Sequence, residues 1–336
     1  MKLQTFHGEV WINACDEIVD AVIEANKSPI DGGYGNDSAS ARATALMQAQ
    51  LSTPIFTTFA INGTAANVMA LKMMLGRCDA ILCAEQTHVH TYEAGAFEYN
   101  LGNKIITAKT EDGKLTPKIL EDLLLATKKY KYRPRVITMA QPTEFGTVYT
   151  PDEIRAICDF AHERGMYVYV DGARIGNAVA ALGTTLHEML EIPDVDAFSF
   201  GGTKAGAMFG EMIVFRRHEF AEGISYAQKQ SLQHMSKSKF LSVQMETILE
   251  KKLWLTLAQK SNALAKKLEE KLCARGYQIY YKVESNMVFC VIPPADFAKL
   301  TDKYDMHYWD EFAHVVRLAL THQNTEADID ELIACL

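Results

Sequence analysis

Short apolar runs alternate with longer amphipathic stretches through the first two thirds of the chain. The runs are strand candidates at 54–61, 80–84, 104–108, 135–140, 166–171 and 197–202. The stretches between them space apolar residues as helices do, and Thr116 and Thr150 stand where N-caps are expected, each followed by a proline. Because helices alternate with strands that are often apolar on both faces, the pattern predicts an α/β fold with a mainly parallel sheet.

The alternation stops after about residue 216. A long, lysine-rich helical stretch at 241–274 is followed by apolar runs and two further helices, which indicate a smaller α+β domain. The chain is therefore expected to have three parts: an N-terminal segment that packs on the functional site (1–25), a large α/β domain (26–240), and a linker helix with the small domain (241–336).

Composition narrows the class of protein. The net charge of −8 argues against nucleic acid or an anionic membrane as a partner. No apolar run approaches the roughly 18 residues of a membrane span, and the N-terminus lacks the apolar stretch of a signal peptide. The seven scattered cysteines fit free thiols in a reducing cytosol, so we expect a cytoplasmic protein that binds no nucleic acid and no membrane.

Chemically distinctive residues follow four of the predicted strands. They are Asn62, Gly63 and Thr64 after the first, His88 after the second, Asp171 at the end of the fifth, and Thr203 and Lys204 after the sixth. Because the carboxyl ends of parallel strands meet at one edge of a sheet, these residues are expected to lie together. His88 and His90 form a His-x-His pair, but no third ligand stands at a metal-binding spacing, so we predict no metal site.

Together these residue types meet the needs of pyridoxal phosphate. The cofactor requires a lysine for a Schiff base, a carboxylate at its ring nitrogen, backbone N–H groups for its phosphate and a flat side chain over its ring. Lys204, Asp171, Gly63–Thr64 and His88 supply these in turn. A structural ion pair for Lys204 and a helix cap for Asp171 are the simpler explanations of single residues, so the prediction depends on the combination. The glycines around Lys204 are expected to leave room for cofactor and substrate.

Five segments resemble the threonine aldolase / β-eliminating lyase family of fold type I pyridoxal-phosphate enzymes, and most of all its low-specificity L-threonine aldolases. They are NGTAANVMAL (62–71), EQTHVHTYEAGA (85–96), DGARIGNAVAALG (171–183), FGGTKAGAMFGE (200–211) and VRLALTHQNTEADID (316–330). The resemblance implies an aspartate-aminotransferase-like large domain and a homodimer or homotetramer with active sites at subunit interfaces. It also implies that a small amino acid of the L-threonine or L-allo-threonine type is cleaved to glycine and an aldehyde.

The resemblance implies a role for each matching residue. Lys204 would carry the cofactor, Asp171 would pair with its ring nitrogen, and His88 would stack on its ring. The residues near its phosphate would be Thr203, Asn62, Gly63 and Thr64. Arg174 and Arg317 would bind the substrate carboxylate, with Arg174 also beside the cofactor, and Tyr34 would lie near the substrate. The simpler explanation of Arg317 is a strand-edge arginine paired with a nearby acid. Where an arginine often neutralises the phosphate in this family, this chain has AQKQSLQHMSKSK (227–239), and Lys229 or Lys237 would take its place.

The chain departs from the family pattern at substrate contacts. Gly8 and Glu9 stand where a small polar residue and an aspartate are usual, and Thr143 and Glu144 stand where better-known aldolases have a histidine. The catalytic base is therefore His88, Glu144 or a water held between them. Because these changes leave the cofactor residues intact, β-elimination, racemisation and transamination remain alternatives. A binding module without catalysis is disfavoured by the intact pair of Lys204 and Asp171.

Overall fold

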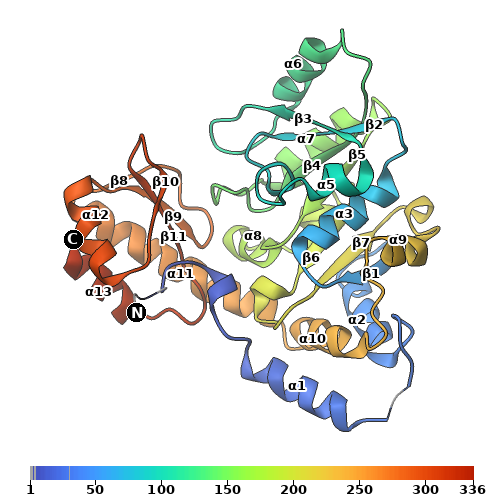
Figure 1. Cartoon of the computed structure of the whole chain (residues 1–336), viewed down its shortest axis with the longest axis horizontal. Helices are drawn as coiled ribbons and strands as arrows, with labels where there is room; N and C mark the ends of the chain where they lie inside the picture. The colour runs from blue at the N-terminus through green and yellow to red at the C-terminus, as the bar shows by residue number, and fades with distance from the viewer. Residues whose placement is uncertain (1–2, 4, 30) are drawn as a thin grey trace.

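The structure is a computed structural model that describes Leu3, residues 5–29 and residues 31–336 (Figure 1). Residues 1, 2 and 4 of the expected N-terminal segment, and residue 30 of the expected large domain, lie outside the described residues. The strands are β1 (Phe56–Ala60), β2 (Asp79–Ala84), β3 (Lys104–Ala108), β4 (Arg133–Ala140), β5 (Tyr167–Asp171), β6 (Ala197–Gly201), β7 (Glu211–Phe215), β8 (Gln278–Ile279), β9 (Met287–Val291), β10 (Tyr308–Asp310) and β11 (Val315–Ala319).

Helices connect most of these strands. The α-helices are α1 (Asp16–Lys27), α2 (Ser38–Gln48), α3 (Gly63–Met74), α4 (His88–Thr91), α5 (Ala96–Leu101), α6 (Pro117–Thr127), α7 (Pro151–His162), α8 (Ile175–Leu182), α9 (Ile224–Gln230), α10 (Lys239–Glu250), α11 (Leu253–Ala274), α12 (Pro294–Lys303) and α13 (Glu326–Cys335). Shorter helical turns are η1 (Glu9–Trp11), η2 (His187–Glu191), η3 (Thr203–Ala205) and η4 (His218–Phe220).

The central sheet has seven strands in the order β1-β7-β6-β5-β4-β2-β3. Strand β7 pairs antiparallel with both of its neighbours, and all other pairs are parallel. The mainly parallel sheet predicted from the sequence is therefore confirmed. Because β7 runs against β6, a short connection joins the two strands at the carboxyl end of β6, and this connection carries Lys204.

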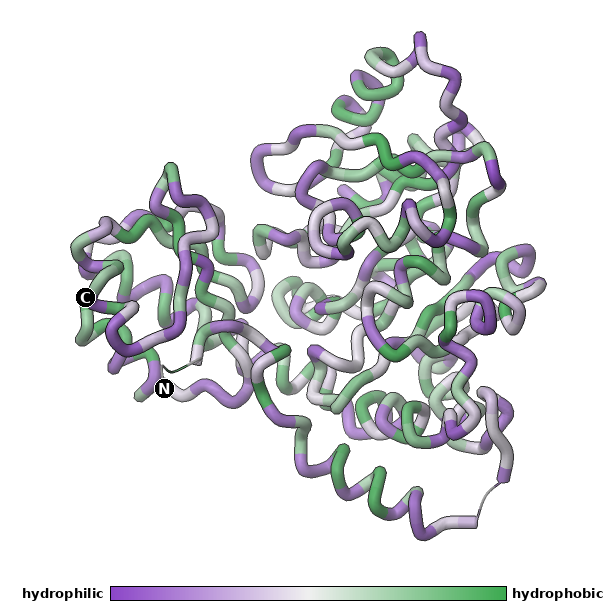
Figure 2. Tube along the Cα trace, in the orientation of Figure 1, coloured by the Kyte–Doolittle hydropathy of each residue, from purple (hydrophilic) through white to green (hydrophobic). Residues whose placement is uncertain are grey.

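Helices cover both faces of this sheet, which explains why its strands are apolar on both sides. In β2, Ile81 and Cys83 join a core that includes α3, whereas Leu82 joins the core on the opposite face, which includes α7, α8 and α10. Figure 2 shows hydrophobic residues along the central strands and hydrophilic residues along outlying helices and loops. The strands are thus packed between helices on both faces, and this packing positions the side chains at the edge of the sheet.

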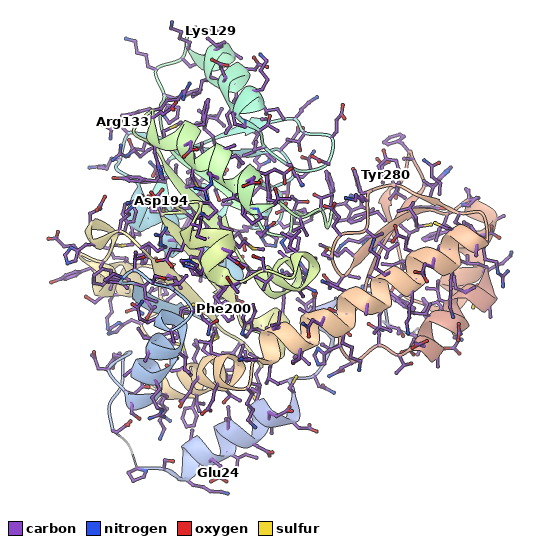
Figure 3. The ribbon with its side chains drawn as sticks, turned by 180° about the vertical axis from the view of Figure 1, so that it is seen from behind. Glu24, Lys129, Arg133, Asp194, Phe200 and Tyr280 are labelled. Carbon is purple, nitrogen blue, oxygen red and sulfur yellow. The ribbon has the colours of Figure 1, made fainter. Side chains whose placement is uncertain are left out.

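A second, antiparallel sheet in the order β10-β11-β9-β8 forms a separate lobe with α11, α12 and α13 against one face. The helical stretch expected at 241–274 is two helices, because Lys252 adopts a left-handed φ of 54° between α10 and α11. Helix α10 packs on α1 and α2, while α11 runs from α8 to the second sheet (Figures 1 and 3). The three-part division at 25/26 and 240/241 stays a prediction.

Candidate active site

Four parallel strands bring the expected site residues to one edge of the central sheet. Strand β1 leads to Asn62 at the start of α3, and β2 leads to His88 at the start of α4. Strand β5 ends at Asp171, and β6 leads into η3, which contains Lys204. These strands run in the same direction, so their carboxyl ends meet as the sequence pattern predicted.

The turn that carries Lys204 is held by backbone contacts. The N–H groups of Gly202 and Thr203 both donate to the carbonyl of Gly210, at 3.0 Å each. A Cβ on Gly202 would lie 2.4 Å from that carbonyl oxygen and 2.5 Å from Sδ of Met245. The glycines beside Lys204 therefore face protein, and close backbone packing explains them better than the expected clearance for a cofactor.

The amine of Lys204 makes no ion pair with any described residue. Burial and the nearby charge of Arg174 lower its pKa to about 8, against the opposing influence of Glu9, Asp171 and Glu211. The structural ion pair that offered the simpler explanation of this lysine is absent from the described part of the chain. A lysine with a depressed pKa and no acidic partner is suited to act as a nucleophile.

A chain of buried hydrogen bonds links Asp171 to His88. Asn67 of α3 donates through Nδ2 to Oδ2 of Asp171 at 2.9 Å and to Oε1 of Glu93 at 2.7 Å. Nδ1 of His88 lies 2.9 Å from the same Glu93 oxygen, and Tyr169 donates to Asn67 at 2.8 Å. Asn67 and Glu93 were missed by sequence reasoning, although a polar residue on the apolar face of α3 was a usable signal.

Glu144 lies beside His88 in the loop that follows β4. Its Oε1 accepts the backbone N–H of His88 at 2.6 Å. Burial raises the pKa of Glu144 to about 7, so both of its protonation states are accessible near neutral pH. The adjacent Thr143 turns into the loop, where its hydroxyl lies 2.7 Å from that of Thr147. The structure therefore places Glu144, but not the hydroxyl of Thr143, next to His88.

Glu211 is a second buried carboxyl near Lys204 that the sequence reasoning missed. The pairing of β6 with β7 sets it opposite Gly201, and its Oε2 accepts the N–H of Gly202 at 3.2 Å. It also makes a hydrogen bond with the side chain of Thr203, while burial raises its pKa to about 7. A charged residue at the head of the apolar run 211–215 was the available signal. Glu211 thus braces the turn that presents Lys204.

The start of α3 offers backbone donors for an anion. Asn62 caps the helix by accepting the N–H of Ala65 at 2.9 Å. The N–H groups of Gly63 and Thr64 have no acceptor among the described residues, and a Cβ on Gly63 would meet no atom within 4 Å. Two free N–H groups at a helix N-terminus beside open space suit a phosphate.

Tyr34 and Lys229 form a different group from the residues around Lys204. The amine of Lys229 lies 5.8 Å from the ring centroid of Tyr34, and that ring stacks on His234 at 4.6 Å. Both residues lie near β1, since Gln228, next to Lys229, donates to Thr58 at 2.6 Å. Within a single described chain, no contact joins Tyr34 or Lys229 to Lys204, so their roles stay predictions.

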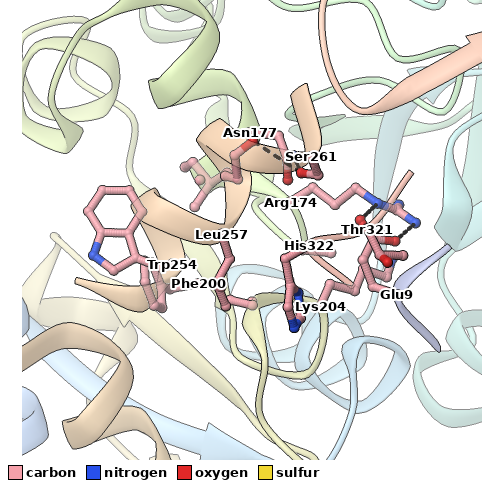
Figure 4. Close-up of a pocket in the computed structure, with 16 residues that line it drawn as sticks. Glu9, Arg174, Asn177, Phe200, Lys204, Trp254, Leu257, Ser261, Thr321 and His322 are labelled. Carbon is pink, nitrogen blue, oxygen red and sulfur yellow. Dashed lines mark hydrogen bonds and ion pairs between the residues drawn. The ribbon is translucent and has the colours of Figure 1, made fainter. Parts of the chain in front are cut away.

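The N-terminal segment contributes Glu9 to the site, the start of α8 contributes Arg174, and β11 of the second sheet contributes Arg317. Gly8 has a positive φ of 93° and leads into η1, where Glu9 is buried. Glu9 accepts two hydrogen bonds from Arg174, each of 2.9 Å (Figure 4). Arg317 pairs with no acid in the described chain, so the strand-edge ion pair that was its simpler explanation is not formed.

These residues fit pyridoxal phosphate. The amine of Lys204 is unpaired, Asp171 is oriented by Asn67, and the N–H groups of Gly63 and Thr64 are free. The His88 ring is held by Glu93 while its side chain keeps 37% exposure, which leaves a face open for stacking. No cluster of His, Cys, Asp or Glu among the described residues could hold a metal ion.

Comparisons with known proteins agree with this arrangement. Residues 12–293 match the family model described as Beta-eliminating lyase. The Low specificity L-threonine aldolase of Pseudomonas aeruginosa is 38% identical over 289 residues, which is 85% of this chain and 83% of that protein. The solved threonine aldolase of Leishmania major has a TM-score of 0.92 at 27% identity, with 97% of this chain and 96% of that chain covered.

A more distant structure shows the fold alone. A Thermus thermophilus aspartate aminotransferase variant, 15% identical, has a TM-score of 0.74 and covers 99% of this chain and 90% of its own. The predicted fold type I, aspartate-aminotransferase-like architecture is therefore confirmed. With the family model spanning most of its length and a curated relative above one third identity, the chain belongs to the threonine aldolase / β-eliminating lyase family.

Proposed function

We propose that this pyridoxal-phosphate-dependent lyase cleaves the Cα–Cβ bond of a β-hydroxy-α-amino acid of the L-threonine or L-allo-threonine type to glycine and an aldehyde. The observation that carries the proposal is the presence, at one sheet edge, of an unpaired amine on Lys204 and a half-buried carboxyl with near-neutral pKa on Glu144. The amine is suited to a carbonyl cofactor, and the carboxyl is suited to take a proton from a β-hydroxyl.

Five residues hold the cofactor, which when bound supplies an electron sink for the pair released at Cα. Lys204 is its attachment point. Asp171, fixed by Asn67, would hold the ring nitrogen, and His88 would pack on the ring. The free N–H groups of Gly63 and Thr64 bind the phosphate, as helix N-termini commonly do.

Arg317 receives the substrate carboxylate. Its Nε is buried without a partner, and burial with the charge of Arg174 lowers its pKa to about 10. A buried guanidinium without an anion is costly, and a substrate carboxylate removes that cost by forming a charge-assisted hydrogen bond. The same contact orients the amino acid relative to Lys204.

Glu144 is the base in this proposal. A carboxyl with a pKa of about 7 holds or releases a proton at neutral pH, which is the condition for efficient general base catalysis. The contact of Glu144 with the backbone of His88 sets both groups over the same part of the site. His88 is fixed in turn by Glu93, so it would pack on the cofactor ring, while Glu144 would accept the proton of the β-hydroxyl.

We also propose a cytoplasmic homodimer or homotetramer with its active sites at subunit interfaces. Tyr34, Tyr226 and Leu232 are 49%, 72% and 90% exposed near Lys229, and a second subunit would cover such side chains. A helix able to cross a membrane is not found among the described residues. The seven cysteines, all within the described residues, are free.

Two measurements test the proposed reaction. Purified protein incubated with pyridoxal phosphate should turn yellow, and borohydride should fix the cofactor to Lys204, with Lys204→Ala as the colourless control. A panel of threonine, allo-threonine, serine and phenylserine should then release glycine and an aldehyde. Wild-type protein that stays colourless defeats the cofactor assignment, whereas pyruvate or another oxo-acid in place of glycine defeats the aldolase assignment.

A further inference from the structure

The edge of the Arg174 guanidinium that carries Nε and Nη2 is already occupied by the carboxylate of Glu9. The Nε and Nη2 groups of Arg174 each donate to one oxygen of the Glu9 carboxylate at 2.9 Å (Figure 4). Asn286 donates to Oε1 of Glu9 at 2.7 Å. Burial alone would raise the pKa of Glu9, but Arg174 outweighs burial and brings it to about 2. The acid is therefore ionised at every working pH, and it forms with Arg174 a pair of zero net charge.

Arg317 stands in contrast to that saturated pair. Its Nη2 lies 3.4 Å from Sδ of Met287, its guanidinium lies 5.8 Å from the ring centroid of Trp309, and its Nε has no partner in the described chain. These contacts leave its positive charge without a compensating anion. Of the two arginines that face the site, only Arg317 is free to take a carboxylate through its own charge.

The backbone fixes Glu9 to the strand that carries Arg317. His7 forms a bridge with Ala319 of β11, and the N–H of Ala319 donates to the carbonyl of Phe6 at 2.9 Å. A Cβ on Gly8 would lie only 3.1 Å from the Cβ of Ala319, and the positive φ of this residue is a conformation that side chains disfavour. Both features favour glycine at this position. Backbone contacts with β11 thus hold Glu9 in the site, so its position does not depend on an unattached N-terminal segment.

The remaining charges around Lys204 are acidic. Glu9, Asp171 and Glu211 all act on its amine, and Glu9 and Lys204 line the same cavity (Figure 4). A second carboxylate on a bound amino acid would therefore lie near the carboxyl groups of Asp171 and Glu211, with the neutralised Arg174 unable to offset the repulsion. Such built-in repulsion is a common source of specificity.

We propose that Glu9 is a specificity-determining residue that neutralises Arg174, so that the site accepts amino acids with one carboxylate through Arg317 and rejects those with a carboxylate on the side chain. The proposal rests on the proposed function for the identity of the site, but it concerns binding rather than cleavage. It predicts that dicarboxylic β-hydroxy amino acids, such as β-hydroxyaspartate, are poor substrates beside threonine.

Binding of glycine and of aspartate tests the proposal independently of the aldol reaction, since neither carries a β-hydroxyl. Both affinities are measured on holoenzyme from the absorbance change of the bound cofactor. In Glu9→Gln the charge of Arg174 is uncompensated, so the ratio of aspartate affinity to glycine affinity should rise at least about tenfold, equivalent to ~1.4 kcal/mol. Glu9→Asp keeps the charge, so its ratio should stay within about threefold of wild type.

Glu24→Gln is the matched control, because it removes one acid at an exposed position of α1, paired with Lys27 at 2.7 Å and well away from the second sheet (Figure 3). It should leave the affinity ratio unchanged. An unchanged ratio in Glu9→Gln, an equal rise in Glu24→Gln, or a rise in Glu9→Asp as large as in Glu9→Gln would each overturn the proposal. Failure of the enzyme to cleave threonine would refute the proposed function while leaving this binding result to stand alone.

Discussion

Replacing Glu144 by glutamine should make the protein more stable and less active. The carboxyl of Glu144 has its pKa carried by burial from 4.5 to about 7, and glutamine removes the ionisable group while its carbonyl oxygen still accepts the N–H of His88. At roughly 1.4 kcal/mol for each tenfold change in proton affinity, this shift corresponds to ~3 kcal/mol of native-state destabilisation above neutral pH. Loss of a general base should lower the rate of glycine release by about 10²–10⁴.

The sign of the pH dependence follows from where the proton is bound. Between pH 4.5 and about 7 the folded protein retains the proton on Glu144 that the unfolded chain has lost, so wild-type stability falls as pH rises through this window. Glu144→Gln should not show this loss of stability, because glutamine does not ionise. Its melting temperature should exceed that of wild type by several degrees at pH 8, and the difference should nearly vanish at pH 4.5.

Calorimetric melting of cofactor-free protein measures this difference without the added stability of a bound cofactor. Glu191→Gln is the matched control, because hydrogen bonds from Thr53 and Ser52 outweigh burial and lower the pKa of Glu191 to about 2. That variant should lose stability at pH 8 and keep its activity. If Glu144→Gln melts below wild type at pH 8, or gains equally at both pH values, Glu144 does not hold a proton near neutral pH as described above.

Three further predictions concern the scaffold. The hydrogen bond from His162 to Asp196 raises the pKa of His162. The stability that this bond contributes is therefore complete below pH 6.5 and is lost as the pH rises through the raised pKa. The difference in melting temperature between wild type and His162→Asn should shrink from pH 6 to pH 8.5. Thr150→Ala removes the capping box of α7 and should cost ~1 kcal/mol in urea unfolding, and an unchanged midpoint contradicts the cap. Gly172→Ala puts a Cβ 2.1 Å from the carbonyl oxygen of Ser199, so it should lower the melting temperature and weaken cofactor retention; wild-type values for both contradict that close approach.

The order of elements could be predicted because it depends on local patterns. Apolar runs of strand length, capped helices and the chemistry at strand ends all lie within short windows of sequence. Lys204, Asp171 and His88 were found in this way, since each lies at or a few residues beyond the carboxyl end of a strand, and the parallel pairing brings those ends together. The break at Lys252 was not predictable, because a lysine in left-handed conformation has no local signature.

Contacts between distant segments account for what the sequence did not reveal. Asn67 matters because two other elements bring Asp171 and Glu93 to its amide, and no spacing in the sequence encodes that meeting. Glu211 gains its role from the antiparallel pairing of β6 with β7. The engagement of Arg174 by Glu9 joins residues 165 positions apart, so pairwise geometry was needed to find it.

The attachment of the first residues to β11 has a consequence for synthesis of the protein. A chain emerging from the ribosome delivers its N-terminal segment first, but the partners of Leu3, Phe6 and His7 lie at residues 303–319 and emerge almost last. Until then the contacts that hold Glu9 beside Arg174 are not formed, although the residues of the Lys204 turn have already been made. A chain that lacks β11 therefore lacks the backbone contacts that hold Glu9 beside Arg174, and this ion pair is completed only when the last strand has been made.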